Sequence, residues 1–233
     1  MSYTAPPDTV IFDGILFDMD GTIIDSTNAV TKNWYTIGNE IGVDPEVILR
    51  TSHGRRTIDT LKILSPDVAN WEYVRKMEAQ LPKLHGQDAV EIPGARALLE
   101  DVIWRKVPWA IVTSGTEPLV SGWLDMLRLP HPEHLVTAES VQHGKPDATC
   151  YLVGREMVGL SREDARVLVV EDSPAGIRAG KAAGCRVIGL TTSHAAEDVL
   201  EADWVVRDLE SIRLIDSGNG KAQVEISNAL LKQ

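Results

Sequence analysis

Short apolar runs alternate with amphipathic segments along most of this 233-residue chain. The apolar runs have the length of strands and end at turn residues, whereas the segments between them carry apolar residues at helical spacing. The runs lie at residues 11–18, 109–113, 166–170, 186–190 and 204–206, and the helical segments at 94–104, 117–127, 147–158 and 175–183. This alternation predicts an α/β fold with a doubly wound parallel sheet. Active sites of such sheets lie at the carboxyl ends of the strands.

The alternation stops once, between about residues 27 and 92. Helical patterns follow one another there, at 28–41, 45–50, 57–64 and 71–81, with no convincing strand between them. We therefore expect a core of residues 1–26 and 93–233, with a small helical cap inserted at 27–92. The two crossings adjoin the first and second strands, so the insertion is placed to act as a lid over the carboxyl edge of the sheet.

Charge and hydropathy exclude several partners. A formal net charge of -11 disfavours nucleic acid, whose phosphate backbone requires clustered Lys and Arg. No apolar run approaches the ~20 residues that span a bilayer, and the first residues lack a signal-peptide pattern. Cys150 and Cys185 have no disulfide or metal-binding spacing. We expect a cytoplasmic protein, a monomer or weak homodimer, without nucleic-acid or membrane partners.

The most informative local motif is Asp18-Met19-Asp20-Gly21-Thr22, directly after the first apolar run. Two carboxylates two residues apart at a strand end can face the same pocket, where one attacks phosphorus and the other moves a proton. A surface turn is the competing interpretation, because Asp and Gly are ordinary turn residues.

Two further polar groups follow later apolar runs. Thr113, with Ser114 and Gly115 after it, offers a hydroxyl and backbone N–H groups that suit the phosphoryl oxygens of a substrate. The alternative is a cap for the next helix. Lys145 precedes Pro146, which fixes the start of a helix and so directs the lysine; a solvated surface lysine is the alternative.

Adjacent carboxylates, Glu171 and Asp172, stand where another strand meets a helix. Magnesium prefers oxygen ligands and is held by a few carboxylates together with the substrate phosphate. Ser173 with Pro174 also has the pattern of a helix cap, and both interpretations can hold at once.

With these motifs in this order, the chain resembles the haloacid dehalogenase-like phosphohydrolases over nearly its whole length. The resemblance implies a Rossmann-like core in which Asp18 is the nucleophile, Asp20 the general acid and base, and Thr113 and Lys145 hold the phosphoryl group. It also implies Mg²⁺ as cofactor, with ligands from Asp18, Asp20 through its backbone carbonyl, Glu171 and Asp172.

Within that family the chain is similar to the fungal glycerol-phosphate and 2-deoxyglucose-6-phosphate phosphatases, through residues 52–57, 111–116, 144–147 and 171–177. The resemblance implies a small sugar or polyol phosphate as substrate. It also implies that His53, Gly54 and Arg56 in the cap bind that substrate, with Arg55 directed outward. Asp25 and Ser26, in contrast, follow the pattern of the wider haloacid dehalogenase-like family and not that of the glycerol-phosphate phosphatases. The particular substrate therefore stays open.

Three alternatives share parts of this pattern. A sugar phosphomutase would keep every motif and return the phosphoryl group to its product. A dehalogenase needs no acid at the second position, so Asp20 argues against it. A non-catalytic regulator that binds phosphometabolites would be expected to have lost a motif, and none is lost here.

Overall fold

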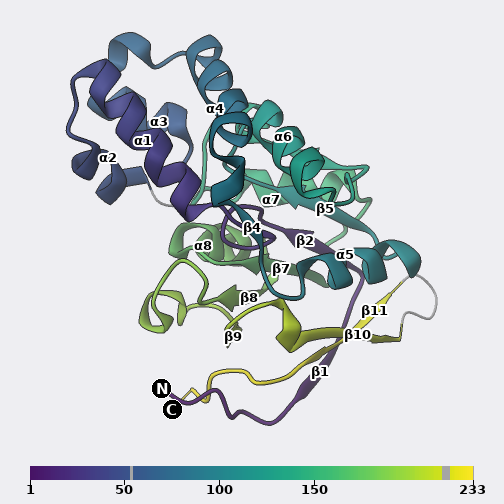
Figure 1. Cartoon of the computed structure of the whole chain (residues 1–233). Helices are drawn as coiled ribbons and strands as arrows, with labels where there is room; N and C mark the ends of the chain where they lie inside the picture. The colour runs from purple at the N-terminus through teal and green to yellow at the C-terminus, as the bar shows by residue number, and fades with distance from the viewer. Residues whose placement is uncertain (53–54, 217–220, 233) are drawn as a thin grey trace.

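The centre of the molecule is a parallel sheet of six strands in the order β6-β5-β2-β7-β8-β9 (Figure 1). This computed structural model describes residues 1–52, 55–216 and 221–232. The strands span Gly14–Phe17 (β2), Trp109–Val112 (β5), Leu135–Val136 (β6), Val167–Glu171 (β7), Arg186–Leu190 (β8) and Trp204–Val206 (β9). Every neighbouring pair is parallel. The expected doubly wound sheet is thereby confirmed.

Helices cover both faces of the sheet because side chains alternate along each strand. On β2, Ile15 and Phe17 join the cluster under α5 and α6, whereas Leu16 joins the cluster under α7 and α8. These helices span Ala95–Trp104 (α5), Glu117–Leu127 (α6), Thr149–Met157 (α7) and Pro174–Ala182 (α8). Because both faces of these strands are buried, their sequences are continuous apolar runs.

We expected one strand at residues 11–18, but this run contains parts of two strands. β1 (Asp8–Phe12) pairs with β11 (Ala222–Ile226), which pairs with β10 (Ile212–Asp216), in a separate antiparallel sheet. The chain changes sheets at the buried Asp13, whose carboxylate accepts a hydrogen bond from the Arg166 N–H at 2.9 Å. Neither β10 nor β11 was predicted from the sequence.

The inserted helices pack around a hydrophobic cluster of their own. They span Thr27–Ile41 (α1), Pro45–Ser52 (α2), Thr57–Leu64 (α3) and Trp71–His85 (α4). The cluster consists of Trp34, Ile37, Ile48, Ile58, Leu61, Val74 and Met77. At the crossings, β3 (Ile24–Asp25) pairs antiparallel with β4 (Val90–Glu91). A strand of two residues shows no periodicity, which is why β4 was not foreseen.

Helix α4 lies along α6 of the core (Figure 1). The approach is close: a Cβ at Gly122 on α6 would lie 2.8 Å from Cγ of Pro82 on α4. The insertion is thus seated beside the carboxyl edge of the sheet. Single-turn 3-10 helices complete the described secondary structure at Pro66–Val68, Gly86–Asp88, Ala138–Ser140, Ala196–Val199 and Leu209–Ser211.

Within the described part of the chain, we find no helix that combines the length and apolar character required to cross a membrane.

Candidate active site

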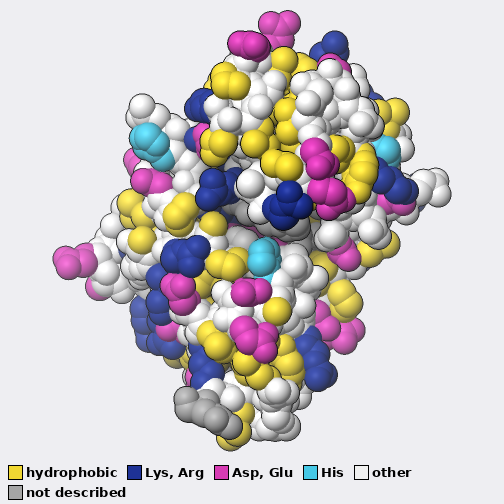
Figure 2. All heavy atoms as spheres, turned by 90° about the vertical axis from the view of Figure 1, so that its left-hand side faces the viewer, with side chains coloured by type: hydrophobic (Ala, Val, Ile, Leu, Met, Phe, Trp, Pro, Cys, Tyr) yellow, Lys and Arg dark blue, Asp and Glu magenta, His cyan; other side chains and the backbone are white. Residues whose placement is uncertain are grey.

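One cavity of about 150 Å³ lies between the carboxyl edge of the sheet and the inserted helices. Figure 2 shows the molecule from the side on which it is hollowed. Its core wall carries the side chains that follow the strands: Asp18 and Asp20 after β2, Thr113 after β5 and Asp172 after β7. Lys145, in the turn before α7, also lines it. Because parallel strands end at one edge, residues up to 154 positions apart in sequence meet here.

Lys145 is a buried cation between two carboxylates. Its ammonium group donates hydrogen bonds to Oδ1 of Asp18, to Oε1 of Glu171 at 2.6 Å and to the carbonyl of Val112 at 3.2 Å. Burial alone would lower the pKa of Lys145, but the charges of Asp18 and Glu171 raise it. Lys145 is therefore a fixed positive charge at the floor of the cavity and cannot act there as a base.

Glu171 is saturated with hydrogen bonds. Oε1 accepts from Lys145 and from the Tyr151 hydroxyl at 3.0 Å. Oε2 accepts from the N–H groups of Asp172 and Ser173 and from the Ser173 hydroxyl, at 2.9 to 3.0 Å. Burial would raise the pKa of Glu171, but Lys145 and these donors lower it. Glu171 is fully buried, and the residues lining the cavity do not include it. In this arrangement it positions Lys145.

Asp18, Glu171 and Asp172 nevertheless each offer a carboxylate oxygen within 4.8 Å of the others. Burial and the neighbouring negative charges raise the pKa of Asp172 to about 7 and that of Asp18 well above its usual value. One lysine does not balance three clustered carboxylates, and oxygen donors in this number are what a hard divalent cation prefers. The residues therefore fit a metal ion. Asp18 and Asp172 are the carboxylates that face the cavity.

Asp20 lies beside Asp18 with its carboxyl held at one oxygen. The Ser26 hydroxyl donates to its Oδ1 at 2.5 Å. Burial raises the pKa of Asp20, opposed by the Ser26 hydrogen bond and the charge of Lys145. A Cβ added at Gly115 would be 3.7 Å from Oδ2 of Asp20, so the turn after β5 passes directly by this carboxyl. Such a group keeps its proton to higher pH than an exposed aspartate does and can release it.

The turn after β5 brings the Thr113 hydroxyl to the cavity, as the sequence indicated, but the Gly115 N–H is donated within the turn. The Thr113 hydroxyl accepts a hydrogen bond from the Gly115 N–H at 3.0 Å, and Ser114 and Gly115 also line the cavity. The N-cap residue of α6 is Thr116, three residues after Thr113, so Thr113 is not the cap of this helix. At the other turn, Ser173 does cap α8, accepting from the Gly176 N–H at 3.1 Å.

Sequence reasoning missed several residues of this cavity. Asn33 and Glu78 come from α1 and α4, and Ser193 and His194 come from the loop after β8. The Ser193 hydroxyl donates to Oδ2 of Asp172. These residues sit on an amphipathic helix or in an ordinary loop, where no spacing distinguishes them.

The cap loop differs most from expectation. Arg56 was expected to bind substrate, but its five N–H groups are all donated elsewhere: to both carboxylate oxygens of Asp59 and to the backbone carbonyls of Ala138, Val141 and Gln142. It is buried and fastens the insertion to the core segment before Lys145. Arg55, expected to point outward, lines the cavity instead. His53 and Gly54, the other residues expected to bind substrate, lie outside the described residues.

We predict that Arg56→Ala lowers the free energy of unfolding by about 2 kcal/mol or more, because the buried carbonyls of Ala138 and Val141 lose their donor. Activity should fall by similar factors on a polyol phosphate and on acetyl phosphate, because the guanidinium touches neither. Chemical denaturation and kcat/KM on both substrates measure this. Arg55→Ala is the matched neighbour and should change stability by less than about 0.5 kcal/mol. A loss confined to the polyol phosphate, with unfolding unchanged, would contradict the anchoring role.

The doubly wound sheet, the carboxylate pair after β2 and the buried lysine define a class of hydrolases with an aspartate at the end of the first parallel strand. Residues 15–190 match the model of the haloacid dehalogenase-like hydrolase family. This chain belongs to that family, as the motifs indicated.

The chain is also similar to individual members of this family. Glycerol-1-phosphate phosphohydrolase 1 of Saccharomyces cerevisiae is 37% identical, over 97% of this chain and 94% of its own length. 2-Deoxyglucose-6-phosphate phosphatase 1 of the same yeast is 32% identical, over 93% of this chain and 96% of its own. The expected similarity to both groups is confirmed. Among solved structures, a hydrolase from Pseudomonas syringae superposes with a TM-score of 0.71 at 24% identity, covering 84% of this chain and 94% of its own, and so shares the fold.

Proposed function

We propose that this protein hydrolyses a small sugar or polyol phosphate monoester through a phosphoryl intermediate on Asp18. The observation that carries the proposal is a buried carboxylate, Asp18, held by Lys145 at the floor of a small cavity with Asp20 beside it. The phosphatases of sugar and polyol phosphates that this chain resembles support the substrate class.

In the first step a carboxylate oxygen of Asp18 attacks phosphorus, the bond from phosphorus to the ester oxygen breaks, and Asp20 protonates the departing alkoxide to an alcohol. In the second step Asp20, now a carboxylate, takes a proton from water as that water attacks the aspartyl phosphate. Inorganic phosphate leaves and Asp18 is regenerated. The charge of Lys145 and the hydroxyl of Thr113 act on the phosphoryl oxygens during both steps.

Magnesium would be held by the carboxylates of Asp18 and Asp172, and the backbone carbonyl of Asp20 would be a further oxygen ligand. When bound, the ion supplies positive charge to the phosphoryl group. Lys145 stays paired with Asp18 and Glu171 and adds a single positive charge beside the phosphoryl group.

We further propose that residues 27–92 act as a cap on a core formed by residues 1–26 and 93–233. The hydrophobic cluster within the inserted helices and the Arg56 contacts at the seam support this division. A cap of this kind excludes water while the aspartyl phosphate forms and admits it for hydrolysis.

We predict magnesium-dependent phosphate release from at least one member of a panel of glycerol phosphates, hexitol phosphates and hexose 6-phosphates. Removal of divalent ions with EDTA should lower the rate at least about 100-fold, because the clustered carboxylates then lack their counter-charge. Added Mg²⁺ should restore it, measured by inorganic phosphate release. If no phosphomonoester were hydrolysed, the proposed activity would be wrong. If EDTA left the rate unchanged, the metal assignment alone would fall.

A further inference from the structure

The cap side of the cavity is built from polar and apolar side chains that none of the steps above uses. Helices α1 to α4 and the loop between α2 and α3 contribute Asn33, Trp34, Leu49, Ser52, Arg55, Thr57, Glu78 and Leu81. The phosphoryl group is common to all phosphomonoesters, so the choice among them depends on contacts made by this wall.

Asn33 is a buried amide without a hydrogen-bond partner among the described residues. Its side chain is 7% exposed and lines the cavity, and no hydrogen bond to it is formed within the described residues. A buried side-chain amide is ordinarily paired, because leaving it unpaired costs free energy. An amide offers both donors and an acceptor. A ligand hydroxyl, which both donates and accepts, would satisfy it from the cavity side.

Glu78, on helix α4, is a second buried polar group on the same wall of the cavity. Its side chain is 4% exposed, and its Oε2 accepts a hydrogen bond from the Thr116 N–H at 2.7 Å. Thr57 also hydrogen-bonds it. These contacts fix the carboxyl beside the turn that carries Thr113, Ser114 and Gly115. Burial raises the pKa of Glu78 to about 7. Above that pH Glu78 is a carboxylate, which accepts hydrogen bonds from hydroxyl groups and repels a second anion, and the repulsion is strong where water is excluded.

We propose that Asn33 and Glu78 form a hydroxyl-binding subsite for the leaving group, which favours neutral polyol or sugar phosphates over substrates with a second acidic group at that end. This inference rests on the proposed phosphatase activity. It also separates the chain from a phosphomutase, because a bisphosphate held across the cavity would bring its second phosphate toward Glu78.

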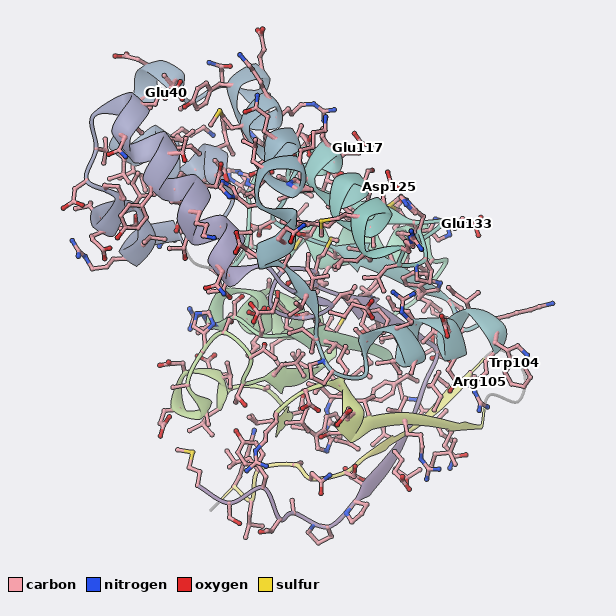
Figure 3. All side chains as sticks on the ribbon, viewed as in Figure 1. Glu40, Trp104, Arg105, Glu117, Asp125 and Glu133 are labelled. Atoms are coloured by element: carbon pink, nitrogen blue, oxygen red, sulfur yellow. The ribbon has the colours of Figure 1, made fainter. Side chains whose placement is uncertain are left out.

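The other charged groups near the cavity do not cancel the repulsion between Glu78 and a second anion. The other charged or titratable groups of the cavity are Asp18, Asp20, Asp172, Lys145, Arg55 and His194. Lys145 is committed to Asp18 and Glu171. Figure 3 shows Glu117 and Asp125 of α6 on the outside of the molecule, and both are exposed, so they do not act on the cavity.

Arg55 is the competing group. It is a cation on the cap wall and is the residue that would attract a second anion. It is exposed, whereas Glu78 is buried, so water weakens the field of Arg55 more than that of Glu78. A preference for acidic substrates that depended on Arg55 would be the opposite outcome.

A matched substrate pair tests the charge selection. Glycerol 3-phosphate and 3-phosphoglycerate have the same carbon chain and differ in a hydroxymethyl group against a carboxylate. At pH 8 with Mg²⁺, the wild type should favour the neutral ester in kcat/KM. Glu78→Gln keeps an acceptor for Thr116 and removes the charge, so the ratio should fall about 10-fold or more. Glu72→Gln, at an exposed position of the same helix, should leave the ratio unchanged.

Asn33→Ala tests the hydroxyl contact. We expect kcat/KM for glycerol 3-phosphate to fall about 10-fold, mainly through KM, with a smaller loss for acetyl phosphate, which has no hydroxyl to bind. Asn39→Ala, exposed on the same helix, is the control.

An unchanged ratio in Glu78→Gln, equal losses in Asn33→Ala on both substrates, or a wild-type preference for phosphoglycerate that Arg55→Ala removes would each overturn the subsite. Turnover of acetyl phosphate by the wild type in these cases would leave the proposed phosphatase activity standing.

Discussion

Asp18→Asn should abolish magnesium-dependent phosphate release. An amide oxygen does not attack phosphorus at a useful rate, and the substitution also removes one charge from the cluster formed with Glu171 and Asp172. The fold should survive, because Lys145 keeps its hydrogen bonds to Glu171 and to the Val112 carbonyl. Steady-state turnover on the best panel substrate, with circular dichroism as a check of folding, measures the effect.

The control for this variant is Asp25→Asn. Asp25 belongs to the same segment, accepts a hydrogen bond from the Thr27 N–H at 3.1 Å and does not line the cavity. It should retain most of the activity. An acid-quenched wild-type reaction should carry phosphate on the peptide that contains Asp18. Turnover by purified Asp18→Asn above about a tenth of wild type, a barrier change of only ~1.4 kcal/mol, would show that another group is the nucleophile. Mass spectrometry must exclude deamidation of the variant.

Asp20→Asn should slow turnover of an alkyl phosphate by a factor of about 10² to 10⁴, the usual contribution of general acid and base catalysis. Substrate binding should change little, since the phosphoryl contacts come from the turns after β5 and before α7. The amide keeps an acceptor for the Ser26 hydroxyl, so the local structure is preserved. Rapid-quench measurement of phosphoenzyme formation isolates the first step.

The leaving group and the pH supply the controls for Asp20. p-Nitrophenyl phosphate, whose leaving group needs little protonation, should lose less of its first-step rate than an alkyl phosphate. Burial raises the pKa of Asp20, so the acid form persists to higher pH. With the alkyl phosphate, the first-step rate should decline as pH rises through that pKa, and the decline should vanish in Asp20→Asn. Equal losses on both esters, with the pH profile unchanged, would place the proton donor elsewhere.

The two arginines of the cap loop show how proximity in sequence misleads about function. Arg55 and Arg56 are adjacent, and the motif suggested that the second binds substrate. In the folded chain Arg55 lines the cavity, whereas Arg56 is buried against the core. Gly144 leaves room for the Arg56 side chain, because a Cβ there would be 2.7 Å from Arg56 Nε. Three of the five hydrogen bonds of Arg56 are to backbone carbonyls, which carry no sequence signature.

The sequence by itself determined the doubly wound sheet and its site edge. Periods of apolar residues fix which segments become strands, and Asp18, Thr113 and Asp172 had to meet because they follow parallel strands that end at one edge. It also placed the inserted helices to within a few residues. These are consequences of local pattern and of a topology with few alternatives.

Only the tertiary structure decided which groups face the substrate. Glu171 and Asp172 are adjacent in sequence, yet hydrogen bonds from Lys145, Tyr151 and Ser173 enclose the first while the second lines the cavity. Asn33 and Glu78 reach that cavity through the packing of α1 and α4 against each other and against the core. Direction and partner of a polar side chain depend on what other segments bring beside it, and no spacing within its own segment records that.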